Sequence, residues 1–221
     1  GNYSVNRDGL ESFAKFAGEQ HKGIPMFLMG DSYGGCLALH VAKMWQDNQL
    51  DAPESFKGIC LNAPAIIGDL PSLPVQLFLR YILAPLMPET TPFFMPHPVS
   101  PDRIWRDVTV REQFSSDKEK SMQLQGGGKP FCLGTAKGLL NALEDVREKV
   151  IPGFKVPYSV AHGIDDWAVP IEGSKFLVEH SSTDEEDRSI RFVEGAYHDL
   201  MADPTRGETV AFHLKWIESR L

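Results

Sequence analysis

Cysteine is scarce in this sequence, which has only Cys36, Cys60 and Cys132 among its 221 residues. An odd number of cysteines without zinc-binding spacing excludes a disulfide framework and indicates a reducing compartment. Cys36 and Cys60 lie in apolar segments, where a thiol behaves as a small buried apolar residue. We therefore expect a cytoplasmic protein.

Basic residues and long apolar runs are also few in this sequence. The 22 Lys and Arg residues are outnumbered by 30 Asp and Glu residues, and the net charge of −8 argues against nucleic acid as a partner. The apolar run Val75–Met87 is too short to span a bilayer. The sequence has no P-loop and no G-x-G-x-x-G motif, and with no zinc spacing either we expect neither a cofactor nor a metal.

The most informative feature that is present is the segment Gly30-Asp31-Ser32-Tyr33-Gly34, which follows the apolar run Ile24–Met29. This order predicts a strand over 24–30, a sharp turn with Ser32 at its apex, and a helix over about 34–48. G-x-S-x-G in this setting is a nucleophile elbow, where small neighbours let the strand and helix backbones pass closely. The alternative is a glycine-rich turn with a purely structural role.

Strands and helices alternate along most of the chain, which is typical of an α/β protein with a parallel sheet. Residues 67–150 interrupt this alternation. We expect a core of residues 1–66 and 151–221, and a helical insertion over 67–150 that buries its own core, forms a lid over Ser32, or does both. The other predicted strands cover 56–64, 156–163 and 189–195, and the other predicted helices cover 8–20, about 131–149, 171–180 and 206–220.

A serine hydroxyl needs a base to take its proton and a carboxylate to orient that base. Both are expected in loops that follow later strands, in the order Ser, Asp, His. Asp165 and Asp166 follow the strand over 156–163; the spacing H-G-x-x-D-x-x-V-P favours Asp166, and the alternative is an acidic turn that caps the next helix. His198 follows the last strand and is the candidate base, whereas His162 is expected to shape the acid turn.

The oxyanion of an acyl-transfer intermediate needs two N–H donors. The backbone N–H of Tyr33, the residue after the nucleophile, is the first candidate. The second normally comes from a loop after an earlier strand, and this sequence offers no candidate for it. Because few residues precede Ser32, we expect the chain to be the C-terminal part of a longer protein and to be weakly active alone.

Together these segments resemble the monoacylglycerol lipase group of α/β-hydrolases, within the serine aminopeptidase-like family. The resemblance rests on five segments: Gly30–Gly35, Asn62–Pro64, Gly138–Leu143, His162–Asp166 and Glu194–His198. It implies an α/β-hydrolase fold with helices on both faces of a mostly parallel sheet, a helical cap, and missing N-terminal strands. It also implies hydrolysis of monoacylglycerols, lysophospholipids or similar esters without metal or cofactor, with Ser32 as nucleophile, Asp166 as acid and His198 as base.

The apolar stretch in the insertion favours a lipid-like ester with a long acyl chain as substrate. The residues expected to line the lid, and to make peripheral contact with a membrane, are Leu77, Phe78, Ile82 and Leu83. Two alternatives stay open within the fold: an esterase for small or aromatic esters, and an aminopeptidase in which Asp31 and Asp69 hold the amine. A non-catalytic binding module is the alternative from another class. The oligomeric state is not predicted.

Overall fold

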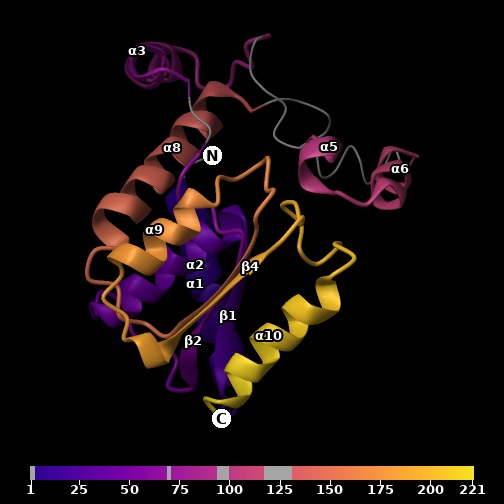
Figure 1. The fold of residues 1–221 in the computed structure, drawn as a ribbon. Coiled ribbons are helices and arrows are strands. Elements are labelled where there is room, and N and C mark those ends of the chain that lie inside the picture. The colour runs from indigo at the N-terminus through magenta and orange to yellow at the C-terminus, as the bar shows by residue number, and fades with distance from the viewer. Residues whose placement is uncertain (1–2, 69–70, 94–99, 117–130) are drawn as a thin grey trace.

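The computed structural model describes residues 3–68, 71–93, 100–116 and 131–221. Its centre is one sheet of four parallel strands in the order β1-β2-β3-β4 (Figure 1). The strands are β1 Met26–Asp31, β2 Phe56–Asn62, β3 Tyr158–Gly163 and β4 Arg188–Val193. The predicted α/β class is therefore confirmed, and the strand ends differ from the predicted ones by about two residues.

The strand register places the carboxyl ends of all four strands at one edge of the sheet. Asp31 pairs with Asn62, Asn62 pairs with Ala161, and Gly163 pairs with Val193. Loops that follow parallel strands meet at this edge, which is where open α/β sheets bind their ligands. The segments that contain Ser32, Asp166 and His198 all begin here.

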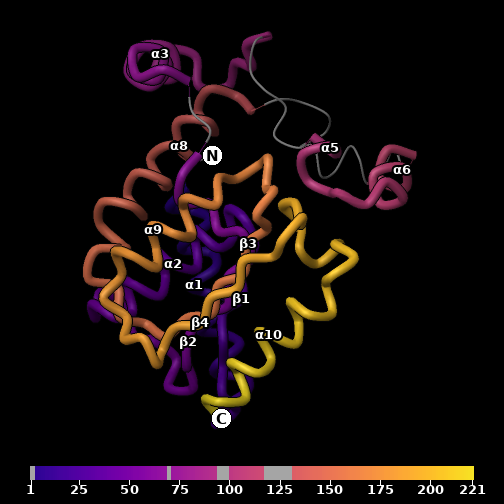
Figure 2. The backbone as a smooth tube through the Cα atoms, viewed as in Figure 1, coloured from indigo at the N-terminus to yellow at the C-terminus, as the bar shows by residue number. Residues whose placement is uncertain are grey.

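Helices cover both faces of the sheet, as Figure 2 shows along the backbone. On one face lie α1 Tyr3–Gln20, α2 Tyr33–Gln46 and α9 Glu172–His180, and on the other lies α10 Arg206–Glu218. The alternation of β3 shows why both faces need cover: His162 contacts Ser174 of α9, whereas its neighbour Ala161 packs in a cluster with Phe212 of α10.

The first helix starts earlier than the sequence predicted, at Tyr3 rather than residue 8. The Tyr3 ring lies 5.3 Å from the ring of His40 in α2, and its hydroxyl donates a hydrogen bond to Asp145. These tertiary contacts stabilise a first turn that periodicity alone does not indicate.

The segment between β2 and β3 is helical in the parts that the structure describes. It contains α3 Leu73–Phe78, a π-helical turn Leu79–Leu83, α4 Ala84–Leu86, α5 Pro101–Ile104, α6 Val108–Ser116, α8 Leu133–Asp145 and a second π-helical turn Val146–Val150. The carbonyl oxygen of Ala142 in α8 lies 3.1 Å from Nε2 of His40, which joins α8 to α2. Figure 1 shows α3 beside one end of α8, and α5 and α6 apart from both.

Candidate active site

Ser32 lies in a strained turn between β1 and α2. Its backbone has φ 53° and ψ −121°, a positive φ that a residue with a side chain rarely adopts. The Ser32 N–H donates to the carbonyl of Asn62 at 2.9 Å, and the Ser32 carbonyl accepts from the N–H of Ala65 at 2.9 Å. Hydrogen bonds from the neighbouring segment therefore hold the strained conformation, as active sites with stored strain require.

Gly30 lets the strand and the helix of this turn approach each other. A Cβ atom at Gly30 would lie 2.6 Å from the carbonyl oxygen of Gly34, whereas a Cβ atom at Gly34 would meet nothing within 4 Å. Within the G-x-S-x-G motif, the close approach therefore depends on the first glycine and not on the last.

Tyr33 is the first residue of α2, so its N–H is one of the helix donors without an intrahelical partner. In the part of the chain that the structure describes, no hydrogen bond uses this N–H. The positive end of the helix dipole lies at the same place, which favours negative charge beside Ser32. The Tyr33 N–H thus lies next to Ser32 and is available, among the described residues, to donate to an oxyanion.

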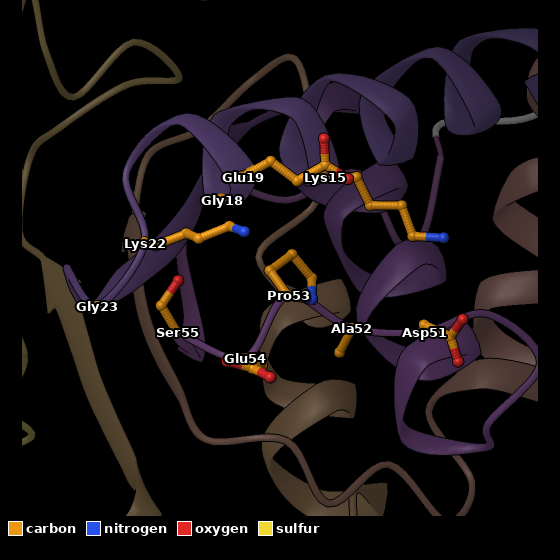
Figure 3. A pocket seen from close by; sticks show the side chains of 10 residues that line it. All are labelled: Lys15, Gly18, Glu19, Lys22, Gly23, Asp51, Ala52, Pro53, Glu54 and Ser55. Carbon is orange, nitrogen blue, oxygen red and sulfur yellow. The ribbon is translucent and has the colours of Figure 1, made fainter.

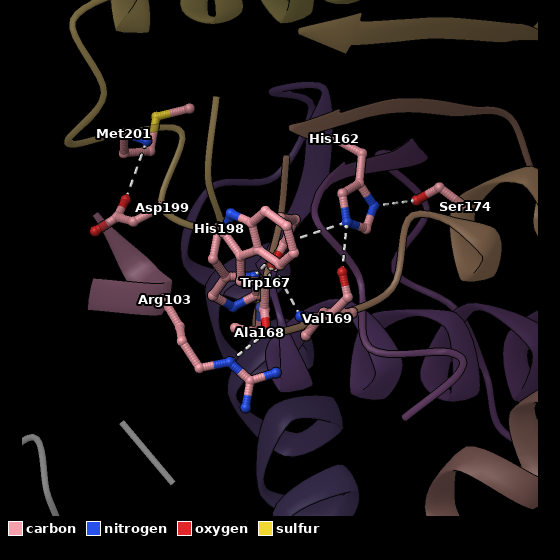
Figure 4. Close-up of polar contacts among 10 residues, drawn as sticks. Arg103, His162, Trp167, Ala168, Val169, Ser174, His198, Asp199 and Met201 are labelled. Carbon is pink, nitrogen blue, oxygen red and sulfur yellow. Dashed lines mark hydrogen bonds and ion pairs between the residues drawn. The ribbon is translucent and has the colours of Figure 1, made fainter. Parts of the chain in front are cut away.

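The Asp166 side chain is fully buried, and its two oxygens accept hydrogen bonds from His162, His198, Ala168 and Val169, which Figure 4 labels. Its Oδ2 lies 2.7 Å from Nδ1 of His198 and 3.1 Å from Nε2 of His162. Its Oδ1 accepts from the N–H groups of Ala168 and Val169, both at 2.8 Å. Burial alone would raise the pKa of Asp166, but the hydrogen bonds from His162 and His198 lower it well below its ordinary value, so the carboxylate is charged.

These contacts fix the tautomers of both histidines. A carboxylate only accepts hydrogen bonds, so Nδ1 of His198 carries its proton toward Asp166 and Nε2 is left to accept one. Nε2 of His162 lies 3.1 Å from the Val169 carbonyl as well as from Asp166, so it also carries a proton. The other nitrogen of a neutral His162 then accepts from the Ser174 hydroxyl at 2.7 Å.

His162 therefore supports the acid in a way that the sequence reading did not foresee. Its expected role was to shape the turn, and its bond to Val169 does so. In addition it donates to the same Asp166 oxygen that orients His198. The signal available in the sequence was the spacing of four residues between a histidine at a strand end and the favoured aspartate.

Gly163 explains how His198 reaches Asp166 although the two residues follow different strands. A Cβ atom at Gly163 would lie 2.3 Å from the Ala196 carbonyl oxygen and 2.4 Å from that of Tyr197. The loop after β4 thus crosses directly over the end of β3. The N–H of Asp165 donates to the Ala196 carbonyl at 3.1 Å, so the backbone of Asp165 ties the two loops together while the side chain of Asp166 contacts His198.

The structure does not bring every predicted site residue together. Among the described residues no hydrogen bond joins the Ser32 hydroxyl to His198, a contact that often tightens only with substrate bound. The predicted lid residues Leu77, Phe78 and Ile82 are 45, 52 and 49% exposed, and Leu83 is half-buried. Asp69 lies outside the described residues. The Asp31 carboxylate accepts a hydrogen bond from Asn62 at 2.7 Å.

A cavity of about 380 Å³ lies at the opposite edge of the sheet, where β1 and β2 begin (Figure 3). Charged side chains of both signs and small residues line it: Lys15, Gly18, Glu19, Lys22, Gly23, Asp51, Ala52, Pro53, Glu54 and Ser55. Its place at the amino ends of the strands separates it from Ser32, Asp166 and His198.

The described parts of the chain contain neither a cluster of metal-binding side chains nor a membrane-spanning helix. No group of three or more His, Cys, Asp or Glu side chains there is placed to hold a metal ion. No helix there has the length and apolar character needed to cross a membrane.

Two relatives with a similar sequence bear the names of a lipase and an esterase. The human monoglyceride lipase is 25% identical over 91% of this chain and 61% of its own length. The caffeoylshikimate esterase of Arabidopsis thaliana is 26% identical over 92% of this chain and 58% of its own length. This chain thus spans about three fifths of these two relatives.

The crystal structure of Paleococcus ferrophilus monoacylglycerol lipase superposes with a TM-score of 0.73 at 20% identity, covering 97% of this chain and 76% of that one. This likeness shows an α/β-hydrolase fold, as the sequence predicted. The family described as "Serine aminopeptidase, S33" matches residues 2–205, nearly the whole chain. The chain therefore belongs to this serine aminopeptidase family of α/β-hydrolases.

Proposed function

We propose that this protein is a serine hydrolase that cleaves carboxylic esters of lipid-like substrates, of the monoacylglycerol or lysophospholipid type. One observation carries the proposal: the buried Asp166 carboxylate holds Nδ1 of His198 at 2.7 Å, at the sheet edge where Ser32 occupies a strained elbow. A purely structural role requires neither the charged, buried acid nor the strained serine.

The residues define two steps of acyl transfer. Ser32 Oγ attacks the ester carbonyl carbon while Nε2 of His198 takes the hydroxyl proton, and the Tyr33 N–H stabilises the oxyanion. The C–O bond of the ester then breaks, and His198 gives its proton to the departing alcohol. A water molecule attacks the acyl group, with His198 again accepting a proton, and the acid leaves as Ser32 regains its own. Asp166 holds the ring and stabilises its protonated form.

The substrate class is supported by the relatives and by the surface of the chain. Two of the comparison proteins bear the names monoglyceride lipase and monoacylglycerol lipase. The stretch from α3 to α4 exposes large apolar side chains, which an acyl chain or a lipid surface would cover. An esterase for aromatic esters is the second candidate, because another relative is a caffeoylshikimate esterase. An aminopeptidase is less favoured, since Asn62 already occupies an oxygen of Asp31.

Fluorophosphonate labelling tests the nucleophile and its base. We expect the probe to modify Ser32, with the modified peptide identified by mass spectrometry. Labelling should be lost in Ser32→Ala and fall by about 10³-fold or more in His198→Ala, because the serine hydroxyl is a poor nucleophile without its base. A folded protein that is not labelled would be either incomplete, lacking the second oxyanion donor, or non-catalytic, and the same labelling of the longer protein would decide between the two. Hydrolysis that is equal in wild type and Ser32→Ala would favour the non-catalytic binding module.

Hydrolysis of nitrophenyl esters of increasing acyl length tests the substrate class. A lipid-like substrate predicts that kcat/KM rises from acetate to longer chains, because each buried methylene contributes about 0.8 kcal/mol. Preference for acetate would reject the lipid ester and leave the small-ester or aromatic-ester alternative.

The same apolar stretch supports a proposal of peripheral membrane contact. Leu77, Phe78 and Ile82 are each close to half exposed and lie on consecutive turns of α3 and the π-helical turn. Since the net charge is −8, apolar contact rather than attraction to anionic lipid would drive this binding.

A further inference from the structure

Residues 103–106, here called the strap, cover the end of α5 and the first residues of its link to α6, and they contact both loops that carry the candidate acid and base. They come from the helical segment between β2 and β3, whereas the loops follow β3 and β4. The strap is therefore a point where the insertion meets the catalytic edge of the sheet directly.

Three contacts join the strap to the loop of His198. The indole Nε1–H of Trp105 donates to Oδ2 of Asp199 at 2.7 Å, and the Asp199 N–H donates to the Ile104 carbonyl at 3.1 Å. Arg106 forms an ion pair with the buried Asp203 at 2.8 Å. Asp199 is the residue directly after His198, so the strap holds the backbone on the C-terminal side of the base.

Both oxygens of the Asp199 carboxylate accept hydrogen bonds in this arrangement. Its Oδ1 accepts from the N–H groups of Met201 and Ala202, both at 3.1 Å, and thereby closes the turn after the base. Its other oxygen takes the Trp105 bond. One carboxylate thus links the turn geometry of the base loop to the strap.

One further contact reaches the acid loop. The Arg103 guanidinium donates through Nε to the carbonyl of Trp167, the residue directly after Asp166 (Figure 4). The strap therefore bonds to the neighbours of both members of the Asp166–His198 pair. Trp105 itself is 8% exposed and packs against Phe114 of α6, with ring centroids 4.6 Å apart, so its indole is fixed in place.

We infer that the strap holds the acid and base loops in a fixed position relative to each other, and that Trp105 is a positioning residue for His198 through its bond to Asp199. The inference rests on the proposed function for its effect on catalysis, and on geometry alone for its effect on the loop. The helical insertion therefore helps to fix the orientation of the His198 ring, in addition to whatever it contributes to substrate binding.

Trp105→Phe tests this, because it keeps an aromatic ring against Phe114 and removes only the indole donor. Two readouts are taken on the same protein: amide hydrogen exchange of peptides covering 194–203, and hydrolysis of a short nitrophenyl ester. We expect faster exchange in this loop and about a tenfold lower kcat, equivalent to about 1.4 kcal/mol, with KM nearly unchanged, since Trp105 is assigned a contact with the loop of the base and none with the ester.

Trp45→Phe is the matched control, because Trp45 is also buried, at 4% exposed, and its indole nitrogen has no hydrogen-bond partner among the described residues. It should change neither exchange in 194–203 nor kcat. Asp199→Asn is the second variant, should Trp105→Phe not fold; it keeps the indole and removes one of the acceptors. The double variant should be no slower than the slower single variant.

Unchanged exchange in 194–203 together with unchanged kcat in both single variants would overturn the inference. A fall in kcat matched by a global loss of stability, with no local change in exchange, would also overturn it. If Ser32 is labelled neither in this chain nor in the longer protein, the proposed function fails, and exchange alone then decides whether the strap holds the loop.

Discussion

At the scale of single residues, the elbow depends on space that only one of its motif glycines supplies. Gly30→Ala would place a methyl group 2.6 Å from the Gly34 carbonyl oxygen, and backbone cannot move aside cheaply. We expect the free energy of unfolding to fall by about 1–3 kcal/mol, the usual cost of overpacking. Urea unfolding followed by circular dichroism measures it.

Gly34→Ala is the matched control for this prediction. Nothing lies within 4 Å of its added methyl group, and Gly34 is in the first turn of α2, where alanine is the better helix former. We expect a change within about 1 kcal/mol. An equal loss in the free energy of unfolding for the two substitutions would show that the close approach at Gly30 is not the cause of the destabilisation.

Single residues also show how much of the candidate site the sequence could predict. The motif and its apolar flanks predicted a serine at a strand-to-helix turn, and the structure places Ser32 there. Spacing favoured Asp166, and its side chain is the one that contacts His198. The four-residue spacing of His162 and Asp166 was the only sequence signal for the second donor to Asp166. The contact of His162 with Ser174 could not be predicted, because the two residues meet only when β3 and α9 pack together.

At the scale of elements, strands and long helices were predictable because their apolar periodicity reflects burial on the sheet. The π-helical turns and the strap were not. A four-residue helix such as α5 carries no periodicity, and its role depends on contacts with Trp167 and Asp199 more than sixty residues away along the chain. Long-range hydrogen bonds of this kind leave no local pattern.

The α3 element carries the prediction on membrane contact. Leu77→Asp combined with Phe78→Asp should lower co-sedimentation with neutral phosphatidylcholine vesicles by about tenfold or more, because burying each side chain contributes about 1.5–3 kcal/mol. Val210→Asp with Leu214→Asp on α10 is the control, since these residues are 41 and 50% exposed. Binding that is unchanged by the first pair, or reduced equally by both pairs, would count against contact through α3.

At the scale of the whole molecule, a chain of hydrogen bonds that is buried from Asn62 inward connects three strands with the last helix. Asn62 donates to Asp31 at 2.7 Å, so its oxygen faces Nε2 of His213 at 2.9 Å. That nitrogen therefore carries the proton, and Nδ1 accepts from the Ser159 hydroxyl at 2.7 Å. His213 is thus held neutral where β1, β2, β3 and α10 meet, and burial lowers its pKa to about 4.

This buried histidine makes the stability of the fold depend on pH. An unfolded histidine has a pKa near 6.5, so between pH 6.5 and about 4 the unfolded state binds a proton that the folded state does not. The contribution of His213 is therefore complete above about pH 6.5 and is lost as pH falls toward 4. At about 1.4 kcal/mol per pKa unit, this amounts to about 2 kcal/mol between pH 7 and pH 5.

His213→Gln, which keeps hydrogen-bonding groups but cannot titrate, isolates that contribution. The free energy of unfolding in urea, measured at pH 7 and pH 5, should fall by about 2 kcal/mol less across this range in the variant than in wild type. His21→Gln, at an exposed position on the other side of the sheet from α10, is the control and should keep the wild-type difference. If His213→Gln keeps the wild-type difference between pH 7 and pH 5 as well, protonation of His213 on unfolding is not the cause of the loss of stability in acid. The hydrogen bonds from Asn62 and Ser159 would then not hold His213 neutral in the folded protein.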